Sequence, residues 1–338
     1  MSRSEEREPG HAHTHEGVHA HLHGAVDPAI LSTHRGIWAV KWSFLGLTAT
    51  AIFQIVIFFL TGSVALFADT IHNFGDAATA VPLWIAFRLA RLGPTRRFTY
   101  GYGRVEDLAG VAIVFTILFS ALFAGHESIQ RLIHPQPIRH LSAVIAAALV
   151  GFLGNEAVAI FRIRVGREIG SAALVADGYH ARVDGLTSLA VLLGAVGVWS
   201  GYPVADPVAG LLITVLIFGI VWESAKSVFT RLLDGISPEV IEEIRHAAEH
   251  IRGVQDVTEV RVRWLGHRMH AELNIAVSQA LSVEEGHKVA IEVRHRLLHH
   301  LRYLSNATIH VDPATASGER HHRIPEHAHG DLSTHSHE

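Results

Sequence analysis

The chain has 338 residues, of which 49% are hydrophobic and 18% are charged, and its formal net charge is −4 with the histidines neutral. The mean hydropathy of +0.26 is too high for an ordinary soluble enzyme, and nothing in the charge balance points to a nucleic-acid partner. The chain contains no cysteine, which excludes disulfides and thiolate metal sites. A bound metal would therefore need histidine, carboxylate, amide or backbone ligands.

Residues 1–35 are polar and rich in histidine, with no apolar run of the kind found in a cleavable secretory signal. We expect them to form a disordered cytoplasmic tail, and we expect a second such tail over residues 314–338. Flexible histidine-rich segments can capture or sense metal, although a merely solvated tail remains the alternative. The histidines in question are His11, His13, His15, His19, His21, His23, His321, His322, His327, His329, His335 and His337.

Residues 36–233 predict a six-helix transmembrane domain, because a bilayer crossing takes about 20 apolar residues. Arginines gather in the connections between the second and third helices and between the fourth and fifth, including Arg162, Arg164 and Arg167. Such loops face the cytoplasm, so we expect both termini there. The short loops and the lack of a presequence favour a multi-pass protein of a prokaryotic cell (inner) membrane. The six predicted spans are Ile37–Leu60, Val64–Leu89, Leu108–Leu132, Leu141–Phe161, Leu174–Trp199 and Pro207–Val228.

Residues 234–313 are more polar and predict a cytoplasmic α+β domain. A helix begins near Pro238, since proline favours the first helical turn. Alternating apolar residues predict strands, and a second helix lies between the second and third of them. The order αββαβ is typical of a ferredoxin-like or metallochaperone-like domain with its helices on one face of a sheet. The later elements are predicted at Val257–Trp264, Met269–Val277, Val283–Leu301 and Ala307–Val311.

The pattern Asp-x-x-His-x-x-x-Asp occurs twice, once in the second predicted span and once in the fifth. Residues at i, i+3 and i+7 share one face of a helix. Ionisable groups in a bilayer cost several kcal/mol unless they pair, face a cavity or hold an ion. The two sets predict one divalent-metal site assembled from two helices, with polar pairing between the helices as the alternative. The two sets are Asp69, His72 and Asp76, and Asp177, His180 and Asp184.

The segments TGSVALFADTIHNFGDA, YGYGRVE, ADGYHARVD and IHVDP, in this order, resemble those of the cation diffusion facilitator family. Members of that family are membrane exporters of zinc and related divalent ions, and the resemblance covers about residues 37–313. It implies a transport site formed by His72, Asp76, His180 and Asp184. Two imidazoles and two carboxylates make a net-neutral tetrahedral set that suits Zn²⁺, with Co²⁺, Ni²⁺ and Cd²⁺ as alternatives.

Asp69 and Asp177 are expected to orient the two histidines as hydrogen-bond acceptors behind the ligands. Proton shuttling, or a position at the water-filled end of the pathway, are the alternatives for these two residues. Because histidine titrates near neutral pH and must be deprotonated to bind metal, we expect exchange of metal for protons. Rocking of the helices would alternate the access to the site.

In the soluble domain the resemblance implies a metal site near a homodimer contact, made from His287, His310 and Asp312. His270 could contribute to it, as could His267, and Zn²⁺ would act there as a regulatory ligand. A histidine of some relatives corresponds to Asn274, which puts a binuclear site in doubt. Ordinary surface histidines are the alternative.

Arg104 and Asp234 both lie at the predicted cytoplasmic membrane boundary. The resemblance implies that they interlock the membrane and soluble parts in the dimer, with a headgroup contact as the alternative for Arg104.

The leading hypothesis is therefore a zinc/proton antiporter that works as a homodimer in the lipid bilayer. A membrane-anchored metal receptor or buffer is the runner-up, and a channel is disfavoured because fast conduction requires weak binding. An enzyme and a resident cofactor are not expected, and the sequence has no GxxxxGK[ST] loop for ATP.

Overall fold

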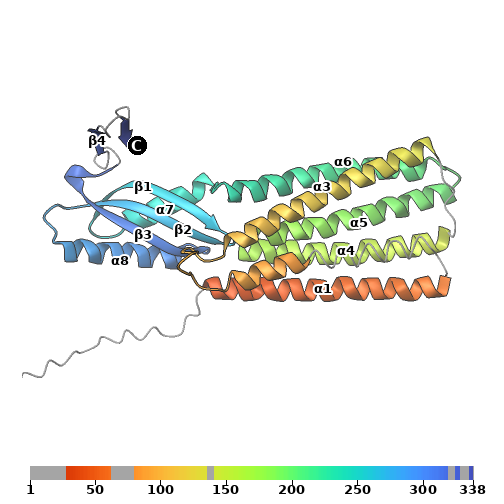
Figure 1. Cartoon of the computed structure of the whole chain (residues 1–338), viewed down its shortest axis with the longest axis horizontal. Coiled ribbons are helices and arrows are strands. Elements are labelled where there is room, and N and C mark those ends of the chain that lie inside the picture. Colours follow the sequence, from red (N-terminus) through yellow and green to blue (C-terminus); the bar gives the residue numbers. More distant parts are fainter. Residues whose placement is uncertain (1–27, 62–79, 135–140, 319–323, 328–334, 338) are drawn as a thin grey trace, which may run out of the picture.

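The computed structural model describes residues 28–61, 80–134, 141–318, 324–327 and 335–337. Long helices form one half of the molecule, and a small sheet with two helices forms the other half (Figure 1). Within the described residues, five helices are long and apolar enough to cross a membrane. They are α1 (Pro28–Thr61), α3 (Arg104–Ile133), α4 (Leu141–Ile169), α5 (Ala172–Trp199) and α6 (Ala205–Leu232).

The second predicted span lies mostly outside the described residues. Only its last part is described, as the apolar helix Ala80–Leu89. Pairs of the helices have long contacts, the most extensive between α4 and α5, which are neighbours along the chain. Gly178 makes this approach possible, because a Cβ there would lie 2.6 Å from Cγ1 of Ile163 and 2.9 Å from its backbone nitrogen.

Two helices extend beyond the predicted apolar stretches. α1 begins at Pro28, so its first turns belong to the segment that was expected to be a disordered tail. α4 continues to Ile169, so Arg162, Arg164 and Arg167 are helical and do not form the predicted connection. The reason is that hydropathy marks the stretch that lipid can surround, whereas the helix continues where its residues contact other parts of the protein.

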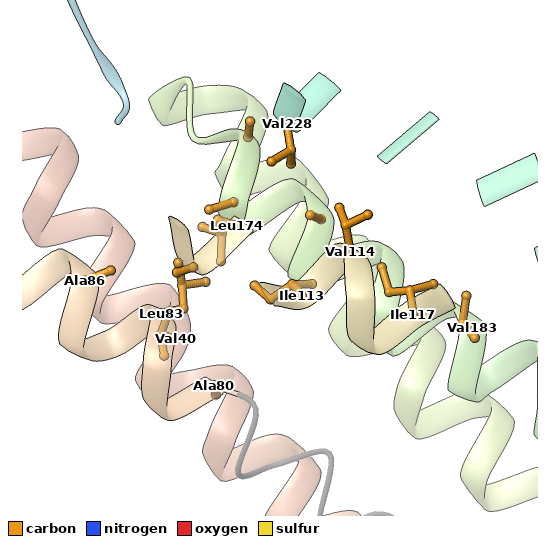
Figure 2. Packing of buried hydrophobic residues seen from close by; sticks show 14 of the residues in the cluster. Val40, Ala80, Leu83, Ala86, Ile113, Val114, Ile117, Leu174, Val183 and Val228 are labelled. Carbon is orange, nitrogen blue, oxygen red and sulfur yellow. The ribbon is translucent and has the colours of Figure 1, made fainter. Parts of the chain in front are cut away.

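Apolar side chains from all these helices pack into one buried cluster. Figure 2 shows part of it, with Val40 on α1, Leu83 on the helix Ala80–Leu89, Ile117 on α3 and Leu174 on α5. Large apolar residues also cover the outside of the helices; Phe119, for example, is 71% exposed. An exterior of this kind suits contact with lipid.

The soluble domain confirms the predicted αββαβ order. β1 and β2 pair antiparallel, and β2 and β3 pair parallel, as expected for two strands joined through a helix. Local sequence signals begin both helices: a proline at the first turn of α7, and a capping box in which Ser282 and Glu285 satisfy each other's backbone N–H groups in α8. The elements are α7 (Pro238–Glu249), β1 (Val254–Leu265), β2 (Arg268–Val277), α8 (Val283–His300) and β3 (Leu304–Pro313).

The C-terminal segment is more ordered than the sequence analysis expected. A short 3₁₀ helix covers Ala314–Ala316, and β4 (Ile324–His327) pairs antiparallel with β5 (His335–His337). Disorder was predicted for residues 314–338 because their polar composition cannot form a hydrophobic core. A two-stranded ribbon needs no core to form its backbone hydrogen bonds, although such ribbons are marginally stable on their own.

Candidate metal centre

Helix α5 carries half of the predicted transport site. It begins at Ala172, where the Ser171 hydroxyl accepts a hydrogen bond from the Leu174 backbone N–H at 3.0 Å. The helical repeat then places Asp177, His180 and Asp184 along one face, and these side chains are 0%, 1% and 4% exposed. A histidine and two carboxylates are thus enclosed within a membrane helix bundle.

His180 and Asp184 form the core of this half-site. Their side chains are one helical turn apart, and Nδ1 of His180 lies 3.8 Å from Oδ2 of Asp184. That separation is too long for a direct hydrogen bond between the two atoms. It leaves one nitrogen and one oxygen ligand side by side, an arrangement that can hold a divalent ion together with ligands from another element.

The other predicted half-site, His72 and Asp76 with Asp69 behind them, lies outside the described residues. Within the part of the chain that is described, no three histidine, aspartate or glutamate side chains group as metal ligands. The four-residue transport site therefore remains a prediction, with the geometry of α5 as its described portion.

Asp177 has a partner that the sequence analysis did not foresee. Its Oδ2 lies 3.1 Å from Nη1 of Arg162 on α4, and both side chains are at most 1% exposed. The expected role of Asp177 behind a histidine stays a prediction; the contact that the structure gives is a buried ion pair between α4 and α5. Arg162 escaped notice because it was assigned to a cytoplasmic loop, and an arginine so close to the ADGYHARVD segment was the available signal.

Asn155 on α4 lies opposite Asp184 on α5, two helical turns away from the contact between Arg162 and Asp177. α4 and α5 run antiparallel, so moving seven residues back from Arg162 and seven forward from Asp177 reaches Asn155 and Asp184. The close approaches of the helices agree, since Gly178 faces Arg162 and Gly185 faces Asn155, where a Cβ on Gly185 would lie 3.4 Å from the Asn155 Cβ. Asn155 is 1% exposed, and its Oδ1 has no hydrogen-bond partner among the described residues. A buried carboxamide oxygen thus lies at the level of the half-site.

The candidate site in the soluble domain is only partly assembled. His310 and Asp312 on β3 are joined by a 2.9 Å contact between Nε2 and Oδ1. Gly286 packs near Val311, so its neighbour His287 lies at the same end of the domain, exposed on α8. These three residues share a region, but they do not form a three-ligand cluster in the described chain.

His270 is separated from this region. It pairs with Asn306 across the sheet, whereas His310 pairs with Asn274, four residues further along β2. That offset corresponds to about 13 Å along the strands. A single-protomer site that includes both His270 and His310 is therefore not formed, because the parallel register fixes them at different heights. His270 instead lies with its ring 6.2 Å from that of Tyr100.

Arg104 and Asp234 form the expected ion pair. Nη2 of Arg104 donates to both carboxylate oxygens of Asp234, at 2.7 and 2.9 Å, and Nη1 donates to the Leu232 carbonyl at 3.0 Å. The pair joins the start of α3 to the end of α6 within one chain. Its role in interlocking the domains of a dimer remains a prediction.

A second polar junction, which the sequence analysis missed, is fully buried between the membrane helices and the soluble domain. His267, in the turn between β1 and β2, places Nδ1 2.6 Å from Oε2 of Glu106 on α3. Ser171 donates to the other oxygen of Glu106 at 2.5 Å, and Nε2 of His267 lies 3.0 Å from Oγ1 of Thr33 on α1. Asp107 accepts from the Gly266 backbone N–H at 3.2 Å.

This junction explains why His267 is not an available metal ligand: both of its ring nitrogens contact other groups. It also joins the soluble domain to the residue that caps α5, the helix with the half-site. The signal in the sequence was an acidic pair, Glu106 and Asp107, in the first turn of an otherwise apolar span.

Known proteins resemble the chain over nearly all of its length. Residues 40–233 match the cation efflux transmembrane domain, and residues 236–314 match the cation efflux protein cytoplasmic domain. A probable cation efflux system protein of Mycobacterium tuberculosis is 54% identical over 297 residues, covering 87% of this chain and 90% of that protein. A manganese efflux system protein of Bacillus subtilis is 26% identical over 267 residues, covering 76% of this chain and 90% of that protein. A solved MamM CTD in a cadmium form is 26% identical and covers 22% of this chain and 95% of that one; its TM-score of 0.22 supports no argument.

Proposed function

The chain belongs to the cation efflux, or cation diffusion facilitator, family of divalent metal transporters, and from this premise we propose that it exports Zn²⁺ in exchange for protons. The observation that carries the proposal is the buried pair of His180 and Asp184 on α5. Burial of both groups inside a membrane bundle is costly unless they serve an ion or a proton. The proposed site is completed by His72 and Asp76.

The preference for zinc rests on ligand chemistry. Two imidazoles with two carboxylates suit Zn²⁺, whereas a set made only of oxygen ligands suits Mn²⁺. A relative at 26% identity is described as a manganese efflux protein, so the family alone does not decide the metal. The histidine on α5 is the described residue that favours zinc, and Co²⁺, Ni²⁺ and Cd²⁺ are the next candidates.

Proton exchange follows from the same ligands. A metal ion and protons compete for His180 and for the proposed partner His72, since a protonated imidazole cannot bind metal. Metal entering from the cytoplasm would release protons, and protons from the opposite side would release metal. We propose that the protein does this as a homodimer, a state that the match of its soluble domain to the family's cytoplasmic domain supports.

The test is metal flux into proteoliposomes under an imposed pH gradient, with Zn²⁺, Co²⁺, Ni²⁺, Cd²⁺ and Mn²⁺ compared. His180→Ala and Asp184→Asn are expected to abolish zinc flux. Ser200→Ala is the control at the far end of the same helix, because the Ser200 hydroxyl is exposed and donates to the Val196 carbonyl at 2.9 Å. Full zinc flux in His180→Ala would reject the site, and flux that ignores the pH gradient would reject proton exchange.

A metal receptor without transport is the competing function, and the same experiment separates the two. A receptor would bind zinc without gradient-driven flux in any variant. His180→Asp adds a test of selectivity: an additional oxygen ligand is expected to lower the ratio of Zn²⁺ to Mn²⁺ transport. An unchanged ratio would indicate that His180 does not select the metal.

A further inference from the structure

Two helices of the soluble domain each carry a pair of exposed histidines one turn apart. His246 and His250 lie on α7, and His295 and His299 lie on α8. In each pair the residues are at i and i+4, so they are neighbours on the helix surface. Ile244 and other core-facing residues of these helices are buried, whereas the histidines of both pairs are exposed to solvent. The four rings therefore contribute little to the core of the domain.

The rings of each pair lie side by side. Their centroids are 4.2 Å apart for His246 and His250, and 4.4 Å apart for His295 and His299. A Zn–N bond is about 2.0–2.1 Å long, so two rings at this separation can each turn a nitrogen toward one ion between them. Histidines at i and i+4 on a helix hold zinc in this way in the H-E-x-x-H pattern. Each pair therefore offers two nitrogen ligands from one helical turn.

A hydrogen bond sets the tautomer of one member of the α7 pair. Nδ1 of His250 lies 2.7 Å from the carbonyl oxygen of His246. A carbonyl oxygen only accepts, so Nδ1 carries the proton, and in the neutral ring Nε2 keeps its lone pair for a metal ion. Histidines that bind metal commonly have their second ring nitrogen fixed by such a bond. His250 is therefore already oriented as a ligand.

Both pairs lie where a bound cation is favoured. His246 is in the last turn of α7 and His250 is its C-cap, while His299 is in the last turn of α8. The C-terminal end of a helix carries a partial negative charge, which attracts cations. Glu243, three residues before His246, adds a carboxylate on the same face of α7, and its Oε1 lies 3.5 Å from Nε2 of His300 on α8. The local charge thus favours a positive ligand at the ends of both helices.

We propose that each pair binds one divalent transition-metal ion on the cytoplasmic domain, held by two imidazoles with water in the remaining positions. Imidazole suits Zn²⁺, Ni²⁺ and Cu²⁺, whereas Mn²⁺ and Mg²⁺ prefer oxygen ligands. Among the described residues no third histidine or carboxylate completes either pair as a ligand set. Binding is therefore expected to be weaker than at a four-ligand site, and readily reversible.

Metal at either pair would stabilise the end of its helix. The two nitrogens come together only when the turn is helical, so an ion that binds there favours the helical state by mass action. The last turns of α7 and α8 would therefore open less often when cytoplasmic metal is abundant. The soluble domain would gain a response to metal that requires neither the transport site nor the candidate site of His310 and Asp312.

The experiment is hydrogen exchange of the full-length protein in detergent, read by mass spectrometry of peptides, with Ni²⁺, Zn²⁺ or Mn²⁺ added. Peptides report each helix separately, so metal bound by the terminal histidines or at the transport site is not what the readout measures. The variants are His246→Gln and His250→Gln on α7, and His295→Gln and His299→Gln on α8. Each pair is the matched control for the other, because every variant removes one exposed histidine from the same domain.

At a free Ni²⁺ concentration of about ten times the dissociation constant, exchange in the last turns of α7 and α8 is expected to slow about tenfold. Mn²⁺ should have little effect. Either α7 variant should remove the slowing on α7 and keep it on α8, and either α8 variant should do the reverse. Unchanged exchange of a helix in the wild type would reject the site on that helix. Equal slowing by Mn²⁺, or an equal loss on both helices from a variant in one pair, would overturn the proposal.

Discussion

Single polar residues on α4 and α5 carry most of the chemistry that the bundle encloses. Arg162 pairs with Asp177, and seven residues along each helix Asn155 lies at the level of Asp184. Arg162 and Asp177 offset each other's charge. Asn155 and Asp184, at the other level, carry oxygen atoms that could bind a transported metal ion. The same helix contact thus supplies a buried ion pair at one level and, under the proposed mechanism, groups for the transported ion at the other.

We predict that Arg162→Leu destabilises the protein by about 3–5 kcal/mol, because it leaves the Asp177 carboxylate buried without its cation. Arg162 and Asp177 are 1% and 0% exposed, so water cannot replace the lost partner. Thermal unfolding in detergent measures the effect. The double variant Arg162→Leu/Asp177→Leu should recover much of the loss. A double variant as unstable as the single one would show that the ion pair is not the source of the effect.

Asn155→Leu is predicted to lower zinc flux without lowering the unfolding temperature. The Asn155 oxygen is buried without a hydrogen-bond partner among the described residues, and such a group costs about 1–3 kcal/mol. Leucine has the same number of side-chain heavy atoms and the same branch at Cγ, so the unfolding temperature should stay equal or rise. Zinc flux should fall if the oxygen serves the ion at the level of Asp184.

Ser224→Ala is the matched control for Asn155→Leu, since the Ser224 hydroxyl on α6 is likewise buried without a partner in the described chain. It should change stability in the same direction and leave flux intact. Undiminished flux in Asn155→Leu would remove Asn155 from the transport pathway.

At the scale of elements, the contact between the β1–β2 turn and α3 decides how the soluble domain sits on the bundle. His267 enters a space enclosed by α1, α3 and the start of α5, where Glu106 and Ser171 receive it. A hydrogen-bonded path thus runs from the soluble domain to the cap of α5. Movement of the domain would act first on the end of the helix that carries His180.

His267→Leu is predicted to destabilise the contact, because among the described residues the buried Glu106 carboxylate then keeps Ser171 as its one side-chain hydrogen-bond partner. The cost should be about 1–3 kcal/mol, and proteolysis should release the soluble domain faster. The variant Glu106→Gln/His267→Leu should be less affected, since a neutral amide is cheaper to bury than a carboxylate. Equal release rates in wild type and His267→Leu would show that this junction does not hold the domain.

The pH dependence of the soluble domain should contain a contribution from His270 on β2. Burial, with Arg263 and Arg268 near by, lowers the pKa of His270 from its ordinary 6.5. The folded chain therefore binds this proton less readily than the unfolded chain. The stability that His270 contributes is complete above pH 6.5 and is lost as the pH falls toward its folded pKa.

His270→Gln should consequently reduce the loss of unfolding temperature between about pH 7 and pH 5, by removing one proton-linked term. Thermal unfolding of the full chain across this range measures the difference from wild type. Curves that run parallel through the whole range would contradict the prediction.

Across the whole molecule, local patterns predicted the elements, and tertiary contacts decided what the polar residues do. The αββαβ order followed from strand alternation and from the proline that begins α7, signals that act within a few residues. The face shared by His180 and Asp184 followed from the helical repeat. The partner of Glu106, by contrast, is 161 residues away in sequence, and no periodicity reports such a contact.

The ion pair of Arg104 with Asp234 connects the membrane helices near the soluble domain. Removing its charge should alter the coupling between the two domains more than the free energy of unfolding. Both side chains are about two-fifths exposed, so the pair contributes only about 0–1 kcal/mol. Asp234 has a φ of 58°, a left-handed conformation that asparagine tolerates better than alanine. Asp234→Asn therefore removes the charge without adding backbone strain, and Asp234→Ala adds that strain.

We predict that Asp234→Asn leaves unfolding temperature and zinc binding nearly unchanged but broadens the distances between spin labels on the soluble domain and on α3. Transport should slow, because a loosely held domain transmits less of its motion to α3 and α6. Arg91→Gln, an exposed charge in the connection before α3, is the control and should alter neither measurement. If Asp234→Asn kept wild-type distances and wild-type flux while only Asp234→Ala lost them, backbone strain rather than the ion pair would be the cause, and the interlock would be rejected.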